Sequence, residues 1–171
     1  MENKHYKIRE DLSVEYMHRT LYRIGALMDL PQHEVKKGDL GGYIESYNNL
    51  IDSAWVTRSA FVCGDAQVSG NAIVGCNARV YGNARIYDNA RVCGNANIFD
   101  SAHVFGNSYV SGVSQVYGNS RVFGDALVSG NSRVSENAQV FGHSHVRGTL
   151  ECTETLRCAV HLECLEPLKF P

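Results

Sequence analysis

Three histidines in the repetitive part of the chain, His103, His143 and His145, are the residues best suited to acid–base chemistry. An imidazole has a pKa near neutral pH, so it can take a proton from an attacking group when it is held in position. Histidines in such a setting are more often only polar surface residues. The three are therefore candidates for a general base, and their surroundings must decide between the two roles.

Three cysteines near the C-terminal end, Cys152, Cys158 and Cys164, recur every six residues with His161 among them. Thiolate and imidazole are the ligands that zinc prefers. The spacing, however, matches no familiar zinc motif. We expect free thiols and no metal site.

Aromatic residues and arginines recur at intervals of eighteen residues. These residue types are enriched at the centres of protein interfaces, although stacked rings can also simply stabilise a sheet. The candidate interface residues are Tyr81, Phe99 and Tyr117 in one row, Tyr87, Phe105, Phe123 and Phe141 in a second row, and Arg85 and Arg121 beside the second. Rings beside cations can bind single-stranded nucleic acid, but the net charge is −2 and no Lys/Arg cluster occurs. We expect a protein partner and no nucleic acid.

A six-residue period positions all of these side chains. From Ile44 to Val146 an aliphatic residue occupies every sixth position, giving eighteen hexapeptides. From Ala54 on, Ala or Ser precedes each aliphatic residue by two positions, and a pair such as Gly82-Asn83 usually follows it. Side chains alternate along a strand, so the small and the aliphatic residue point the same way. Gly, Asn and Asp tolerate the left-handed backbone of a tight corner. Each hexapeptide therefore predicts one short strand and one corner.

Three corners close a triangle of eighteen residues, and stacked triangles can hydrogen-bond to one another about 4.8 Å apart. The sequence thus predicts an all-β, single-stranded parallel β-helix of about seven coils. Residues 44–148 would form the regular part. Residues 149–171 would form a final coil and tail, in which Cys152, Cys158 and Cys164 replace the aliphatic residues and leucines replace the small ones.

Residues 1–43 lack the repeat and should cap the open end of the first coil, because that end exposes unpaired backbone groups. Ser13–Leu30 could form a helix, since apolar residues there have helical spacing. Leu21–Ile24 could equally form a strand. The first residues lack an apolar signal core, and no run approaches the roughly 20 apolar residues of a membrane helix. We expect a cytoplasmic protein.

The repeat resembles the hexapeptide-repeat proteins that form left-handed β-helices, and the resemblance implies a left-handed coil. The stretch Val35–Ile44, VKKGDLGGYI, resembles the lead-in of bacterial and prophage-borne members, some labelled acyltransferases. The resemblance implies an enzyme that uses acetyl-CoA, with a histidine as general base in a cleft between the subunits of a trimer. The family's enzymes usually carry a long loop between coils, and none interrupts residues 44–146. Nor do the three histidines reproduce the spacing of γ-class carbonic anhydrases.

We therefore expect a non-catalytic binding or assembly protein without a cofactor. It would form a homo-oligomer, a dimer or a trimer, and would bind a macromolecular partner through its aromatic and Arg rows. If the chain is prophage-encoded, that partner could be a host component. The alternative function is acetyl-CoA-dependent acyl transfer.

Overall fold

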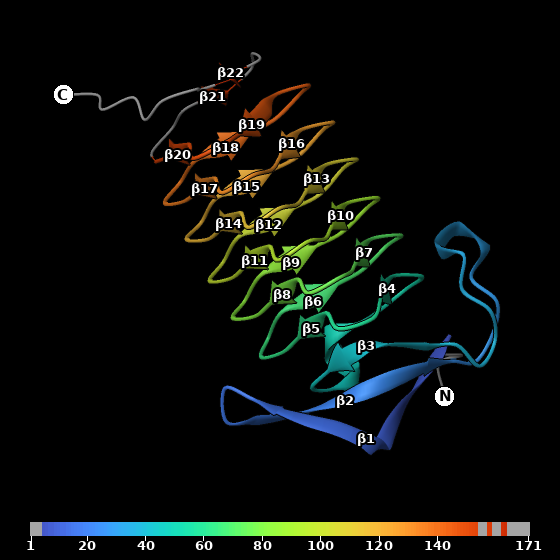
Figure 1. Cartoon of the computed structure of the whole chain (residues 1–171). Helices are drawn as coiled ribbons and strands as arrows, with labels where there is room; N and C mark the ends of the chain where they lie inside the picture. The colour runs from blue at the N-terminus through green and yellow to red at the C-terminus, as the bar shows by residue number, and fades with distance from the viewer. Residues whose placement is uncertain (1–4, 154–156, 159–161, 164–171) are drawn as a thin grey trace.

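The structure is a computed structural model that describes residues 5–153, 157–158 and 162–163. It is a parallel β-solenoid of about six coils whose short strands form three sheets (Figure 1). The predicted single-stranded β-helix is confirmed.

Sheet A contains β1 (Tyr6–Tyr16), β2 (Arg19–Ala26), β3 (Leu40–Ile44), β5 (Phe61–Val62), β8 (Arg79–Val80), β11 (Asn97–Ile98), β14 (Gln115–Val116), β17 (Arg133–Val134) and β20 (Glu151–Cys152). Sheet B contains β6 (Gln67–Val68), β9 (Arg85–Ile86), β12 (His103–Val104), β15 (Arg121–Val122), β18 (Gln139–Val140) and β21 (Arg157–Cys158). Sheet C contains β4 (Trp55–Val56), β7 (Ile73–Val74), β10 (Arg91–Val92), β13 (Tyr109–Val110), β16 (Leu127–Val128), β19 (His145–Arg147) and β22 (Leu162–Glu163). Two short 3-10 helices are η1 (Pro31–His33) and η2 (Tyr47–Asn49).

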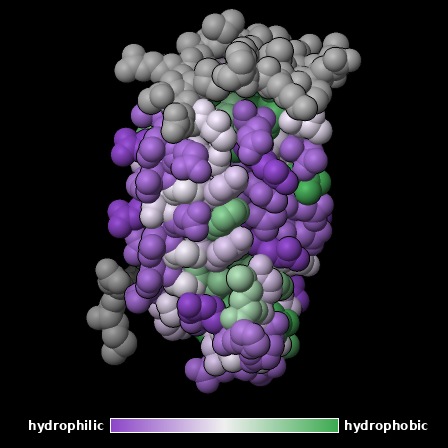
Figure 2. Space-filling view, turned by 90° about the vertical axis from the view of Figure 1, so that its left-hand side faces the viewer, coloured by the Kyte–Doolittle hydropathy of each residue, from purple (hydrophilic) through white to green (hydrophobic). Residues whose placement is uncertain are grey.

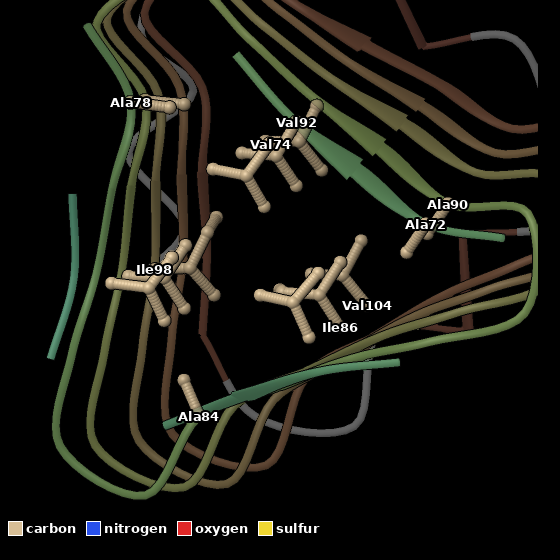
Figure 3. Close-up of a cluster of buried hydrophobic side chains, with 14 of the residues drawn as sticks. Ala72, Val74, Ala78, Ala84, Ile86, Ala90, Val92, Ile98 and Val104 are labelled. Carbon is tan, nitrogen blue, oxygen red and sulfur yellow. The ribbon is translucent and has the colours of Figure 1, made fainter. Parts of the chain in front are cut away.

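Residues that pair between neighbouring coils are eighteen positions apart in the sequence. Ile98 pairs with Val116 in sheet A, and Val104 pairs with Val122 in sheet B. Figure 3 shows the result from within one region of the core: aliphatic side chains from all three sheets point to the centre of the triangle, and alanines lie near its corners. The inward positions are almost fully buried, so packing determines which residues occupy them.

Several corners carry Asp where others carry Gly, and both take a positive φ. Asp88 (φ 59°) and Asp100 (φ 55°) are examples. The Asp88 Oδ2 accepts a hydrogen bond from the Gly106 N–H at 3.1 Å, and the Asp100 Oδ2 accepts one from the Gly118 N–H at 3.1 Å. Each carboxylate thus satisfies a backbone donor one coil later, which compensates for the strain of its left-handed backbone.

Two buried serines among the described residues, Ser108 and Ser135, have a hydroxyl without a hydrogen bond. Ser108 lies between Ala90 and Ala126 in the inward column, is fully buried, and its hydroxyl has no partner within the described part of the chain. By contrast, the Ser114 hydroxyl donates to the Ser111 carbonyl at 2.6 Å. An unpaired buried hydroxyl destabilises a fold by its desolvation penalty.

We therefore expect Ser108→Ala to raise the free energy of unfolding by about 1 kcal/mol, and Ser114→Ala to lower it by about 1 kcal/mol. Urea unfolding of the two variants beside the wild type measures both changes. A loss of stability in Ser108→Ala would show that its hydroxyl is hydrogen-bonded in solution.

The N-terminal residues form a hairpin and not a helix. β1 pairs antiparallel with β2, β2 pairs antiparallel with β3, and β3 pairs parallel with β5. The helix considered for Ser13–Leu30 is wrong, because Met17 (φ 50°) and His18 (φ 58°) form a left-handed turn between the two strands. The strand alternative for Leu21–Ile24 is right, since both residues lie in β2 and are fully buried. The hairpin extends sheet A beyond the first coil, where the edge would otherwise be unpaired.

Residues 27–39, which we call the arm, leave the hairpin and rise beside β4 and β7 (Figure 1). Leu30 and Val35 belong to the hydrophobic core, and the Leu30 N–H donates to the Val35 carbonyl at 2.8 Å. The ring of His33 donates from Nε2 to the Ser53 carbonyl at 2.8 Å. These contacts fix the arm against the first coils.

The last coil keeps only part of the predicted period. Cys152 pairs with Val134 and Cys158 pairs with Val140, as expected. Val146, however, pairs with Leu162, sixteen residues later, so the expected pairing with Cys164 is wrong. Cys164 and His161 themselves lie outside the described residues. Among the residues that are described, no three His, Cys, Asp or Glu side chains gather as a metal site.

Candidate functional site

Sheet B presents a row of basic side chains. Arg85, His103 and Arg121 each begin one of its strands and pair directly with one another across three coils. The two arginines are exposed, and His103 is partly buried. The row is positioned by the repeat, because residues before the aliphatic position point outward from every strand.

Beside this row lies the ring ladder, formed by Tyr87, Phe105, Phe123 and Phe141. Successive ring centroids are 4.8, 5.0 and 5.3 Å apart, and the planes differ by 5° to 12°. This separation is close to that of neighbouring strands, about 4.8 Å, so each ring lies directly over the one before. All four rings are partly buried. The structure thus brings these predicted interface residues together with Arg85 and Arg121.

Stacking limits which parts of the aromatic rings can contact a partner. Tyr81, Phe99 and Tyr117 form a second ladder, with centroids 5.1 and 4.9 Å apart and planes within 3°. Because ring covers ring, most ring faces are already occupied, and only the end rings of each ladder keep a face on which a nucleic-acid base could stack. The ring edges remain for contact with a partner. Each stacked pair also stabilises the solenoid by about 1 kcal/mol.

A shallow pocket of about 330 Å³ lies at the N-terminal end of sheet B, with Arg85, Tyr87 and His103 among its lining residues. The edge of the His103 ring faces Tyr87, with centroids 6.0 Å apart and planes at 87°. Burial, and then the charges of Arg121 and Arg85, lower the pKa of His103. Its imidazole is therefore neutral at neutral pH and could accept a proton.

The other two histidines lie elsewhere. His143 is on the corner between sheets B and C, 89% exposed, with its Nδ1 3.7 Å from the Asp125 Oδ2. His145 is in β19 of sheet C. The structure therefore does not bring the three candidate bases together.

Sequence reasoning missed the placement of the acidic residues. Between residues 52 and 150, every Asp and Glu lies on one of the two corners that border sheet B. The corner after the strands of sheet A carries Asp65, Asp100 and Glu136. The corner that leads from sheet B to sheet C carries Asp52, Asp88 and Asp125. The sequence alone could have revealed this placement, because counting in steps of eighteen residues assigns each Asp and Glu to a corner. Sheet B is thus a basic strip between two acidic borders.

The N-terminal segments lie on the other two sheets. Tyr16 of the hairpin packs on Phe61 of sheet A with ring centroids 5.1 Å apart, and the Arg79 Cζ is 5.6 Å from the centre of the Tyr16 ring. The arm lies on sheet C through His33. Figure 2, which views the molecule from the left of Figure 1, shows how residue types form bands on the surface, with paler residues between hydrophilic ones.

Two stretches of the repeat are similar to a known family. A family profile described as the YdcK beta solenoid repeat matches residues 78–94 and 114–130. Each match spans about one coil, and the two begin at the inward small residues Ala78 and Ser114. A search of curated proteins gave no match. No helix in the described part of the chain is long and apolar enough to cross a membrane. In fold and repeat, this chain is a β-solenoid repeat protein.

Proposed function

We propose that the protein is a non-catalytic scaffold that self-associates through sheet B and the ring ladder, and that binds a macromolecular partner as an assembled oligomer. The observation that carries this proposal is the charge pattern of sheet B. A rigid solenoid suits this role, because each strand holds its outward side chain in a fixed position.

The charge pattern of sheet B is complementary to itself. Arg85 and Arg121 occupy its centre, whereas carboxylates such as Asp88 and Asp100 occupy both borders. Two copies related by a two-fold axis, shifted sideways by part of a sheet width, place the arginines of each copy against a border of the other. A two-fold interface uses the same surface on both subunits, so a self-complementary surface is what it requires.

The ring ladder supplies apolar contact at the border of this surface. Its ring edges lie beside Asp88, between the basic row and the corner. Aromatic residues next to arginines are typical of the residues that dominate binding energy. The hairpin and the arm pack on sheets A and C, which supports the choice of sheet B as the interface.

Charge reversal tests the proposal. We expect Arg121→Glu to convert the oligomer to a monomer, because each interface would gain repulsion at two symmetric positions. The matched control is Arg133→Glu, an equally exposed first residue of a strand in sheet A, which should leave the oligomer intact. Light scattering on a sizing column measures the mass of all three proteins. A monomeric wild type, or an unchanged Arg121→Glu oligomer, would contradict the proposal.

Acetyl-CoA-dependent acyl transfer is the second candidate, favoured by the neutral His103 in its pocket. None of the described residues hydrogen-bonds the His103 ring, so nothing in this part of the chain orients it as a base. If acetyl-CoA binds there, a hundredfold excess over its dissociation constant stabilises the protein by about 2.7 kcal/mol. An unchanged melting temperature would exclude this candidate and leave the scaffold.

A further inference from the structure

We propose that the groove between the arm and the corner joining sheets B and C binds a neutral oligosaccharide. The groove adjoins one border of the surface proposed for self-association, because Asn89 directly follows Asp88 on the same corner. It has a volume of about 530 Å³, within the range of small-molecule sites. His33 and Glu34 line it from the arm, and Asn71, Asn89, Asn107 and Arg91 line it from the coils.

The coil side of the groove is a row of oriented amides. The Asn71 Nδ2 donates to the Asn89 Oδ1 at 3.4 Å, and the Asn89 Nδ2 donates to the Asn107 Oδ1 at 3.1 Å. The Asn107 Nδ2 donates in turn to the Asp125 Oδ1 at 3.0 Å. Each bond uses one of the two N–H groups and one of the two lone pairs of an amide. The row therefore keeps a donor and an acceptor free on successive coils, in fixed orientations.

The arm adds a fixed acceptor. Because the Ser53 carbonyl can only accept, the hydrogen bond from the His33 Nε2 places the proton on that nitrogen. Burial lowers the pKa of His33, with smaller contributions from His5 and Arg91, so the ring is neutral at neutral pH. Its Nδ1 then has an unused lone pair on a residue that lines the groove.

The charges of the groove balance. Arg91 and Glu34 line opposite sides, and neither has an ion-pair partner among the residues that the structure describes. Both side chains are planar and present two polar atoms side by side. Such a fork matches two adjacent hydroxyl groups.

These features favour a saccharide over other ligands. A hydroxyl group donates and accepts at once, so it pairs with the amide row, and an uncharged chain is not repelled by Glu34 or Arg91. A polyphosphate would be repelled by Glu34. A peptide strand would need free backbone groups, yet the Ile73 N–H already donates to the Ala90 carbonyl and the Arg91 N–H to the Ser108 carbonyl.

The arm is held before any ligand arrives. Leu30 and Val35 are buried in the core, and the Gly38 N–H donates to the Ala26 carbonyl at 2.9 Å. A groove whose two walls are fixed loses little entropy on binding. Burial of the arm's anchors thus supports a preformed site.

Calorimetric titration of the full-length protein tests the inference, with three hexasaccharides as probes: β-1,4-linked glucose, β-1,4-linked N-acetylglucosamine and α-1,4-linked glucose. At least one should bind. Asn89→Ala removes the middle of the amide row and should weaken that binding about tenfold or more. The matched control is Asn95→Ala, because Asn95 accepts a similar bond from Asn77 at 3.3 Å on another corner, outside the groove.

Asn95→Ala should bind the saccharide like the wild type, and equal melting temperatures for the two variants would show that both are folded. Arg121→Glu should also keep the binding, so failure of the self-association proposal leaves this test standing. Absence of binding for all three hexasaccharides, or equal weakening by Asn89→Ala and Asn95→Ala, would overturn the inference.

Discussion

Asn49→Ala is expected to destabilise the protein by about 3 kcal/mol, because one buried side chain holds four backbone groups. Its Oδ1 accepts hydrogen bonds from the N–H groups of Glu45 and Ser46, at 3.2 and 2.8 Å. Its Nδ2 donates to the carbonyls of Gly64 and Ala66, both at 2.9 Å. Asn49 is completely buried, so water cannot replace these bonds without opening the first corner.

The control is Asn97→Ala. The Asn97 Nδ2 also donates to a backbone carbonyl, that of Asn95, at 3.2 Å, but the bond is exposed. Removing it should change stability by less than about 1 kcal/mol. Urea unfolding followed by circular dichroism gives both values. Equal losses in the two variants would show that the first corner does not depend on Asn49.

The regular coils could be predicted from the sequence because the period itself specifies them. Every sixth position from Val56 to Val146 is buried, and only a closed triangle of short strands buries all of them together. The rows of rings followed from the same count. Once Tyr87 and Phe105 are eighteen residues apart, their stacking is a consequence of the fold.

The irregular parts could not be predicted, because tertiary contacts decide them. Val14 and Leu21 have helical spacing, yet they face each other across the hairpin since Met17 and His18 turn the chain. In the sequence Asn49 looks like an ordinary loop residue. Its role depends on the carbonyls of Gly64 and Ala66, which only the fold places beside it. At the other end, the pairing of Val146 with Leu162 departs from a count that holds everywhere before it.

The two candidate sites also differ in whether the sequence predicts them. Arg85, Arg121 and the ring ladder were found by counting, because sheet B consists only of repeats. The saccharide groove was not found, since one of its walls is the arm, whose position depends on the buried Leu30 and Val35. A row of asparagines alone would have suggested only a structural ladder, as the row with Asn77 and Asn95 still does.

Gly112→Ala is expected to destabilise the solenoid by about 3 kcal/mol, through two separate effects. Gly112 has a φ of +73°, a conformation that costs an alanine about 1 kcal/mol. A Cβ added there would lie 2.5 Å from the Gly130 carbonyl oxygen and 2.7 Å from the Gly130 nitrogen. Backbone atoms of the next coil would have to move away, which strains the hydrogen bonds between the two coils, including Val113 N–H to Gly130 carbonyl at 2.7 Å.

Gly64→Ala separates the two effects. Gly64 has a similar φ of +68°, but a Cβ added there would lie 3.3 Å from the Gly82 carbonyl oxygen and 3.4 Å from the Gly82 nitrogen, so this variant should lose only about 1 kcal/mol. Cys76 occupies the same corner as Gly112 two coils earlier with a φ of 58°, which shows that a residue with a side chain can adopt this left-handed backbone in the solenoid. The difference between the two variants, measured by urea unfolding, is therefore the cost of separating coils. If both variants lose the same amount, backbone conformation alone explains the corner glycines, and the spacing of the coils is more adaptable than their hydrogen-bond lengths indicate.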